Sequence, residues 1–132
     1  MKIMDMDINP TDLIIAEAFS RFVDDIDIYN NSWNPTGFEW LAQPEPLTLA
    51  AMKRAVTGEG GTAGRNGLGA IFVFSAGNEY LTDNDPGPTD GKPDWRTDYS
   101  GFSSSRLTIN VAAVGHDGVK VCLLYTSPSP RD

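Results

Sequence analysis

The sequence has one cysteine, one histidine, few basic side chains and no long apolar run. The lone Cys122 can form neither an internal disulfide nor a cysteine metal cluster. The apolar runs are short pieces such as Ala70–Phe74, far below the roughly 18 residues that a membrane-spanning helix needs. Ten Lys and Arg stand against 18 Asp and Glu, a net charge of −8, which argues against nucleic acid and anionic membranes as partners. We expect no nucleic-acid partner and no membrane span.

What remains is typical of a globular protein. A chain of 132 residues with 40% hydrophobic and 21% charged side chains is expected to form one domain. Met1–Asp5 alternates acidic and apolar residues, so no targeting signal is expected there. Residues 122–132 continue no helical or strand pattern and resemble a translated sequencing adapter. We interpret residues 1–121 as a partial domain and 122–132 as a readthrough tail, the alternative being a disordered natural C-terminus.

Two segments have apolar residues at helical spacing. Asn9 followed by Pro10 predicts a helix start with Asn9 as N-cap, and Asp12 then lies at the positive end of the helix dipole. The stripe of this helix that we expect to face a core comprises Ile15, Ala18, Phe19, Phe22 and Val23. A second helix is expected to end at Gly58. Its packing face of mostly small residues comprises Leu47, Ala50, Ala51 and Ala55.

Three segments favour strands. Residues 26–31 alternate in a β-prone pattern, and the continuous run Ala70–Phe74 predicts a strand buried on both faces. Leu107–Val114 predicts a third strand, followed by a turn at 115–118. A helix and a strand repeated in this order indicate an α/β fold with a parallel sheet.

A small-residue segment with a side-chain amide follows the most apolar strand directly. Ser75, Ala76, Gly77 and Asn78 would lie at the carboxyl edge of the sheet, where α/β proteins place their sites. The amide of Asn78 is a neutral donor that can stabilise a developing oxyanion without changing its protonation state. The alternative from the tetrapeptide alone is an asparagine-capped turn.

Several motifs in order resemble the catalytic domain of subtilisin-like serine proteases (peptidase S8), and within them the kexin/furin-like branch. The motifs are Asp27–Pro35, Gly64–Asn78 and Ser100–Ser105. The resemblance implies an α/β, three-layer subtilisin-like fold with a mainly parallel sheet, present here only in part. It also implies serine-type endopeptidase chemistry through an acyl-enzyme, peptide or protein substrates, a monomeric parent, and an extracellular or secretory-pathway location.

The resemblance assigns roles to particular residues. Asn78 would be the catalytic oxyanion-hole side chain. The substrate-binding residues would be Ser32, Trp33, Asn34, Pro35, Ser75, Ala76 and Gly77. Calcium sites are common in the family, and Asp83 and Asp85 form the best local cluster for structural Ca²⁺. A simply solvated loop is the alternative for those two carboxylates.

The departures from the family pattern are as informative as the matches. The sequence has no Asp-Thr-Gly, Asp-Asp-Gly, His-Gly-Thr or Gly-Thr-Ser motif, so no member of the Asp/His/Ser triad is present. We interpret the chain as an internal fragment that is inactive by itself. The alternative is a non-catalytic α/β module that binds extended peptides, and a dinucleotide-binding domain based on Gly64–Gly69 is a distant third.

Two other features are expected to carry no catalysis of their own, and a third bears on substrate specificity. His116 is expected in an exposed turn, and Ser103–Ser105 in a turn and strand start without a general base. Thr36, Gly37 and Ser100 stand where the kexin/furin branch would place acidic pocket residues, so the resemblance does not support dibasic specificity.

Overall fold

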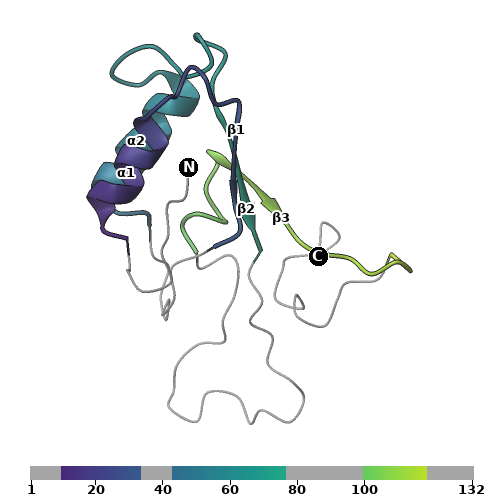
Figure 1. Ribbon diagram of the computed structural model, residues 1–132. Helices are drawn as coiled ribbons and strands as arrows, with labels where there is room; N and C mark the ends of the chain where they lie inside the picture. Colours follow the sequence, from purple (N-terminus) through teal and green to yellow (C-terminus); the bar gives the residue numbers. More distant parts are fainter. Residues whose placement is uncertain (1–9, 34–42, 77–99, 119–132) are drawn as a thin grey trace, which may run out of the picture. The chain divides into compact units, whose positions relative to one another are not determined.

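The computed structural model describes residues 10–33, 43–76 and 100–118. In these ranges the elements are α1 (Asp12–Ser20), β1 (Ile28–Asn31), α2 (Pro46–Thr57), β2 (Ile71–Ser75) and β3 (Thr108–Val111). The strands form one parallel sheet in the order β1-β2-β3 (Figure 1). The predicted α/β class and parallel sheet are therefore confirmed. Neither α1 nor α2 is long and apolar enough to cross a bilayer.

The chain divides into two compact units. Unit 1 comprises Met1–Asn30 and Pro44–Phe72, and unit 2 comprises Asn31–Gln43 and Val73–Asp132. Unit 1 holds both helices, and unit 2 holds β3 and the segments that follow β1 and β2.

Helix α1 begins at Asp12, later than the sequence predicted. Thr11 is the N-cap, with extended backbone angles and a side chain that accepts a hydrogen bond from the Ile14 amide at 3.4 Å. A hydroxyl in this position satisfies one of the unpaired amides of the first turn. The predicted cap, Asn9, lies outside the described residues.

The predicted apolar stripe of α1 is correct only as far as the helix extends. Ile15, Ala18 and Phe19 are buried, but the helix ends at Ser20. Phe22 has a φ of 57° and its side chain is 59% exposed, so its predicted place in the core was wrong. The left-handed backbone at Phe22 takes the side chain off the helical face.

Helix α2 ends as predicted and begins with an unpredicted cap. Gly58 adopts a φ of 76°, and its amide donates to the Arg54 carbonyl at 2.9 Å. At the other end, the Asp12 carboxylate of α1 accepts hydrogen bonds from the amides of Leu47 (2.9 Å) and Thr48 (2.8 Å) and from the Thr48 hydroxyl (2.6 Å). A side chain from the first turn of α1 therefore caps the start of α2.

The buried face of α2 differs from the predicted one. Ala51 and Ala55 are buried as expected, together with Thr48 and Met52. Leu47 is 51% exposed and Ala50 is exposed, so their predicted core positions were wrong. Compared with the predicted orientation, the helix is turned about its axis so that Met52, its largest buried side chain, is fully enclosed.

The core of unit 1 is aromatic. The Phe19 ring lies edge-on to Tyr29 and Phe72, with centroid distances of 5.8 and 4.8 Å. Tyr29 and Phe72 stack at 4.7 Å. Helix α1 packs against α2, and burial raises the pKa of Tyr29.

Strand β2 is buried on one face rather than on both. Phe72 and Phe74 are 1% and 0% exposed, whereas Ile71, Val73 and Ser75 are half-buried. The alternation of side chains along a strand places these two sets on opposite faces. Strand β3 is shorter than the predicted Leu107–Val114, and its residues are half-buried or exposed.

The glycine-rich turn between α2 and β2 has a packing role. Gly64 and Gly69 are buried, and an added Cβ would lie 2.6 Å from a Val23 side-chain carbon or 2.5 Å from the Val56 carbonyl oxygen, respectively. Arg65 donates from its amide to the Val23 carbonyl and from Nε to Asp27, at 3.0 and 2.8 Å. These contacts fix the turn against the chain that leads into β1.

Candidate functional site

Two of the predicted substrate-binding segments follow neighbouring parallel strands. Ser32 and Trp33 come after β1, and Ala76 comes after β2, whose last residue is Ser75. Within unit 2, the Asn31 side-chain amide donates to the Val73 carbonyl at 3.3 Å. Because parallel neighbours end at the same edge of a sheet, the two segments leave the sheet together. This edge is where α/β proteins bind ligands.

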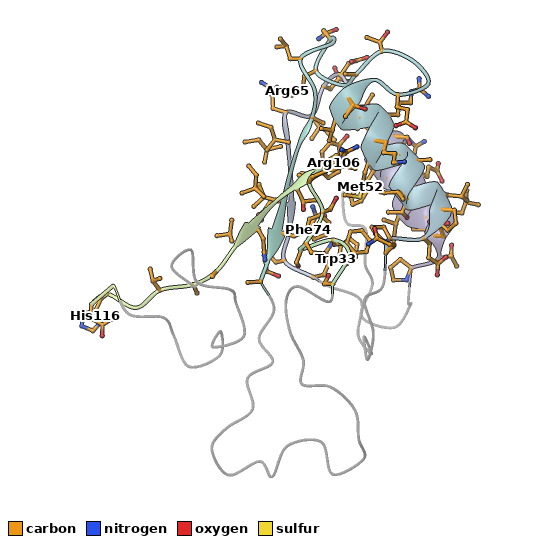
Figure 2. All side chains as sticks on the ribbon, turned by 180° about the vertical axis from the view of Figure 1, so that it is seen from behind. Trp33, Met52, Arg65, Phe74, Arg106 and His116 are labelled. Carbon is orange, nitrogen blue, oxygen red and sulfur yellow. The ribbon has the colours of Figure 1, made fainter. Side chains whose placement is uncertain are left out.

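An aromatic cluster of Trp33, Phe74 and Phe102 supports the first segment. The ring centroids lie 5.7 Å (Trp33–Phe74), 5.5 Å (Trp33–Phe102) and 5.0 Å (Phe74–Phe102) apart. Figure 2 shows Trp33 beside Phe74. Phe74 and Phe102 are buried and Trp33 is half-buried. The cluster holds the Trp33 indole by edge-to-face contacts, the geometry that aromatic pairs prefer.

Hydrogen bonds fix the second segment. The Ser103 hydroxyl donates to the Ser75 carbonyl at 3.4 Å, and the Ala76 amide donates to the Val111 carbonyl at 3.0 Å. Ala76 is 5% exposed. The backbone that leads toward Asn78 is thus tied to two other parts of unit 2.

Ser103–Ser105 lie in a turn before β3, as the sequence predicted. The Ser104 amide and hydroxyl both donate to the Ser100 carbonyl, at 2.9 and 2.8 Å. Ser105 accepts a hydrogen bond from the Leu107 amide at 3.1 Å. These hydroxyls serve the turn, and no histidine or carboxylate partner is bonded to Ser104 or Ser105 in the described part of the chain.

Six of the predicted site residues lie outside the described residues: Asn34, Pro35, Gly77, Asn78, Asp83 and Asp85. Within the described ranges, no three His, Cys, Asp or Glu side chains gather where they could hold a metal ion. His116 is exposed in its turn, as predicted (Figure 2).

The described walls of the site are uncharged. Ser32, Trp33, Ser75 and Ala76 are neutral, and the charged or titratable side chains of unit 2 in the described ranges are exposed: Arg106, His116 and Asp117. Sequence reasoning missed the supporting roles of Phe102 and Ser103. The Ser100–Ser105 motif had marked the segment, but its contacts with β2 join residues distant in the sequence.

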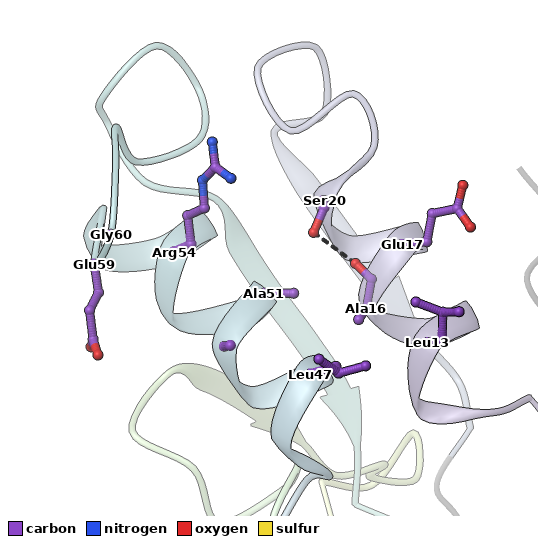
Figure 3. Close-up of a pocket in the computed structure, with 10 residues that line it drawn as sticks. Leu13, Ala16, Glu17, Ser20, Leu47, Ala51, Arg54, Glu59 and Gly60 are labelled. Carbon is purple, nitrogen blue, oxygen red and sulfur yellow. Dashed lines mark hydrogen bonds between the residues drawn. The ribbon is translucent and has the colours of Figure 1, made fainter.

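Unit 1 contains a separate open groove between α1 and α2, of about 550 Å³ (Figure 3). Leu13 and Leu47 line it together with Glu17, Arg54 and Glu59. Among the described residues that line the groove, the one hydroxyl is that of Ser20, which donates to the Ala16 carbonyl of its own helix at 2.8 Å.

The parallel sheet with a small-residue segment at its carboxyl edge places the chain among α/β proteins that bind ligands at this edge. Comparison with known proteins then identifies the family. The sequence profile of the Subtilase family (peptidase S8) matches residues 1–124. This chain belongs to the subtilase family.

Proteins named as convertases or endoproteases are among its relatives. The chain is 32% identical over 115 residues to the PC3-like endoprotease variant B of Hydra vulgaris, covering 86% of this chain and 14% of that protein. It is 36% identical over 109 residues to human neuroendocrine convertase 2, covering 82% of this chain and 14% of the convertase. The chain thus spans about 14% of the length of these relatives.

Proposed function

We propose that this chain is a segment of the catalytic domain of a subtilisin-like serine endopeptidase. The observation that carries the proposal is the convergence of the segments after β1 and β2 at one sheet edge in a subtilase chain. In the proposal, this segment supplies an oxyanion donor and two walls of the substrate site. The triad residues are supplied by parts of the parent protein that this sequence does not include.

Asn78 is the proposed electrostatic group. It follows Ala76 by two residues, and the Ala76 backbone is held by its hydrogen bond to Val111. A side-chain amide aimed at the tetrahedral intermediate would donate to the negative oxygen as charge develops there. Because the amide is neutral, the group needs no proton transfer of its own.

The proposed substrate walls act by shape and by backbone pairing. Ser32, Trp33, Asn34 and Pro35 would present a strand edge to an extended peptide, which gains affinity from main-chain hydrogen bonds. Ser75, Ala76 and Gly77 have small side chains that leave space for a substrate residue. The aromatic cluster beneath Trp33 would keep the first wall rigid.

Four further parts of the proposal rest mainly on the family. The parent would act on peptides or proteins, in the secretory pathway or outside the cell, as a monomer. Structural Ca²⁺ would be held by Asp83 and Asp85, whose carboxylate oxygens suit a hard cation. No catalytic step is assigned to the metal.

The test begins with recovery of the flanking gene. We expect a His-Gly-Thr motif upstream and a Gly-Thr-Ser motif downstream of this segment. In the full protein, Asn78→Ala should lower kcat by roughly 100- to 1,000-fold, the range known for the oxyanion asparagine of subtilisin. The matched control is Asn110→Ala, an exposed position on β3, which should leave hydrolysis unchanged.

Two results would count against the proposal. Flanking sequence without either triad motif, with peptide binding but no hydrolysis, would favour the non-catalytic peptide-binding module. Peptide hydrolysis by this purified chain alone, abolished by Asn78→Ala, would contradict its expected inactivity as a fragment.

A further inference from the structure

The turn between α2 and β2 contains the single Asn-Gly pair of the sequence, Asn66–Gly67. Both residues are exposed and have left-handed backbone, with φ values of 55° and 94°. The Asn66 side-chain amide makes no hydrogen bond to any described residue, so it is free to rotate toward the next peptide bond. Gly67 has no side chain to shield its backbone nitrogen.

We propose that Asn66 is a site of spontaneous deamidation and isomerisation. The Gly67 backbone nitrogen loses its proton and forms a bond to Cγ of Asn66. The bond from Cγ to the side-chain nitrogen breaks, and ammonia leaves with the proton, which closes a five-membered succinimide. Water then opens the ring at Cγ to give aspartate, or at the main-chain carbonyl to give isoaspartate. This proposal is independent of the proposed protease function.

The folded turn restrains the attacking atom. The Gly67 amide donates to the carbonyls of Ala63 and Gly64, at 3.0 and 3.2 Å. The backbone amide of Asn66 donates to Oδ1 of Asp24 at 3.0 Å. An amide held in this way must be released before it can attack, so the reaction proceeds through local opening of the turn. The rate at Asn66 therefore reports how often the turn opens.

The product disturbs unit 1. Deamidation adds a negative charge at residue 66, whose amide already contacts the Asp24 carboxylate, and like charges at short range repel. Isoaspartate also adds a methylene to the main chain inside a turn whose ends, Gly64 and Gly69, are tightly packed. The turn can absorb neither change without losing its contacts to Val23 and Asp27.

The experiment ages the purified chain at mildly alkaline pH and follows each asparagine by peptide mapping with mass spectrometry, using fragmentation that separates aspartate from isoaspartate. Asn66 should convert first, ahead of Asn110, which is exposed but is followed by the β-branched Val111. Urea should accelerate conversion at Asn66. The matched control Asn66→Gly tolerates the left-handed turn and should abolish ammonia release from this peptide.

A second variant tests the restraint. Asp24→Ala removes a hydrogen bond to a charged group, which should raise the open fraction, and with it the rate at Asn66, by roughly tenfold. If this variant unfolds the chain, its rate should equal the rate in urea. If Asn66 converts no faster than Asn110, it is not the preferred deamidation site. If the rate at Asn66 is unchanged by urea and by Asp24→Ala, opening of the turn does not limit the reaction.

Discussion

Each of the two units contains an aromatic cluster, and the two clusters have different roles. In unit 1, Phe19 packs against β1 and β2 side chains and holds a helical layer in place. In unit 2, Phe74 and Phe102 pack under Trp33, at the point where β1 has ended and the proposed substrate wall begins. One cluster therefore serves stability, and the other positions residues proposed to touch substrate. Consecutive buried residues of one strand, Phe72 and Phe74, belong to the two different clusters.

The sharpest test of this division substitutes one buried ring in each unit. Phe19→Ala and Phe74→Ala each remove a side chain that is 0% exposed and should each lower the free energy of unfolding by about 3–5 kcal/mol. Phe22→Ala is the matched control for Phe19, because its ring is 59% exposed. Chemical denaturation measures all three.

The readout that separates the units is the indole NMR signal of Trp33. It should shift in Phe74→Ala and stay in place in Phe19→Ala if each cluster acts within its own unit. Equal shifts in both variants would show that the two clusters form one cooperative core.

A second comparison uses two glycines with similar positive φ, where alanine would be strained. Gly69 and Gly60 have φ values of 86° and 80°, but an added Cβ would be 2.5 Å from the Val56 carbonyl at Gly69 and would meet nothing within 4 Å at Gly60. Both alanine substitutions should incur roughly 1–2 kcal/mol for left-handed backbone. Gly69→Ala should lose a further 1–3 kcal/mol, approximately, from overpacking. Thermal unfolding of both variants measures the difference. Equal losses of stability in the two variants would show that close packing at Gly69 contributes nothing.

The smallest expected effect is a pH dependence confined to unit 1. Partial burial works to raise the pKa of Asp12, but hydrogen bonds from the Thr48 side chain and from the amides of Leu47 and Thr48 lower it below the ordinary value of 3.8. A group whose pKa is lowered by folding stabilises the fold fully above its unfolded pKa. That stabilisation is lost as the pH falls through the lower, folded pKa.

Denaturation across the acid range measures this dependence. Asp12→Asn should flatten the acid limb of the stability profile, and Thr48→Val should move the Asp12 pKa back toward 3.8. Asp25→Asn is the control, because Asp25 is exposed and its side chain makes no hydrogen bond to any described residue. An acid limb that is the same in Asp12→Asn and in the parent chain would show that another carboxylate causes it.

The sequence was sufficient to predict the order of the elements, because each depends on local pattern. The Gly58 stop followed from its left-handed propensity, and β2 from a run of apolar residues. The motifs also predicted the family, which the comparison confirmed. Of the proposed site residues, Ser75 and Ala76 were predicted at the carboxyl edge of the sheet from the strand that precedes them, whereas Ser32 and Trp33 were assigned only by the family resemblance.

The errors arose where contacts distant in sequence decide the local structure. The sequence did not indicate that Asp12 would cap α2, since its partners are more than 30 residues away. Phe22 fits a helical stripe, but the chain turns there so that the Val23 carbonyl can meet the Arg65 amide. Ile71 and Val73 extend an apolar run, yet the described chain buries only the alternate face of β2.

The cap that Asp12 of α1 provides for α2 bears on the order in which the chain folds. Its bonds to Thr48 close a loop of 36 residues, and closing a loop has an entropic cost that local helix formation does not. The first turn of α2 gains its cap only after α1 has docked. The two helices are therefore expected to become stable together, with β1 in the loop that their contact closes.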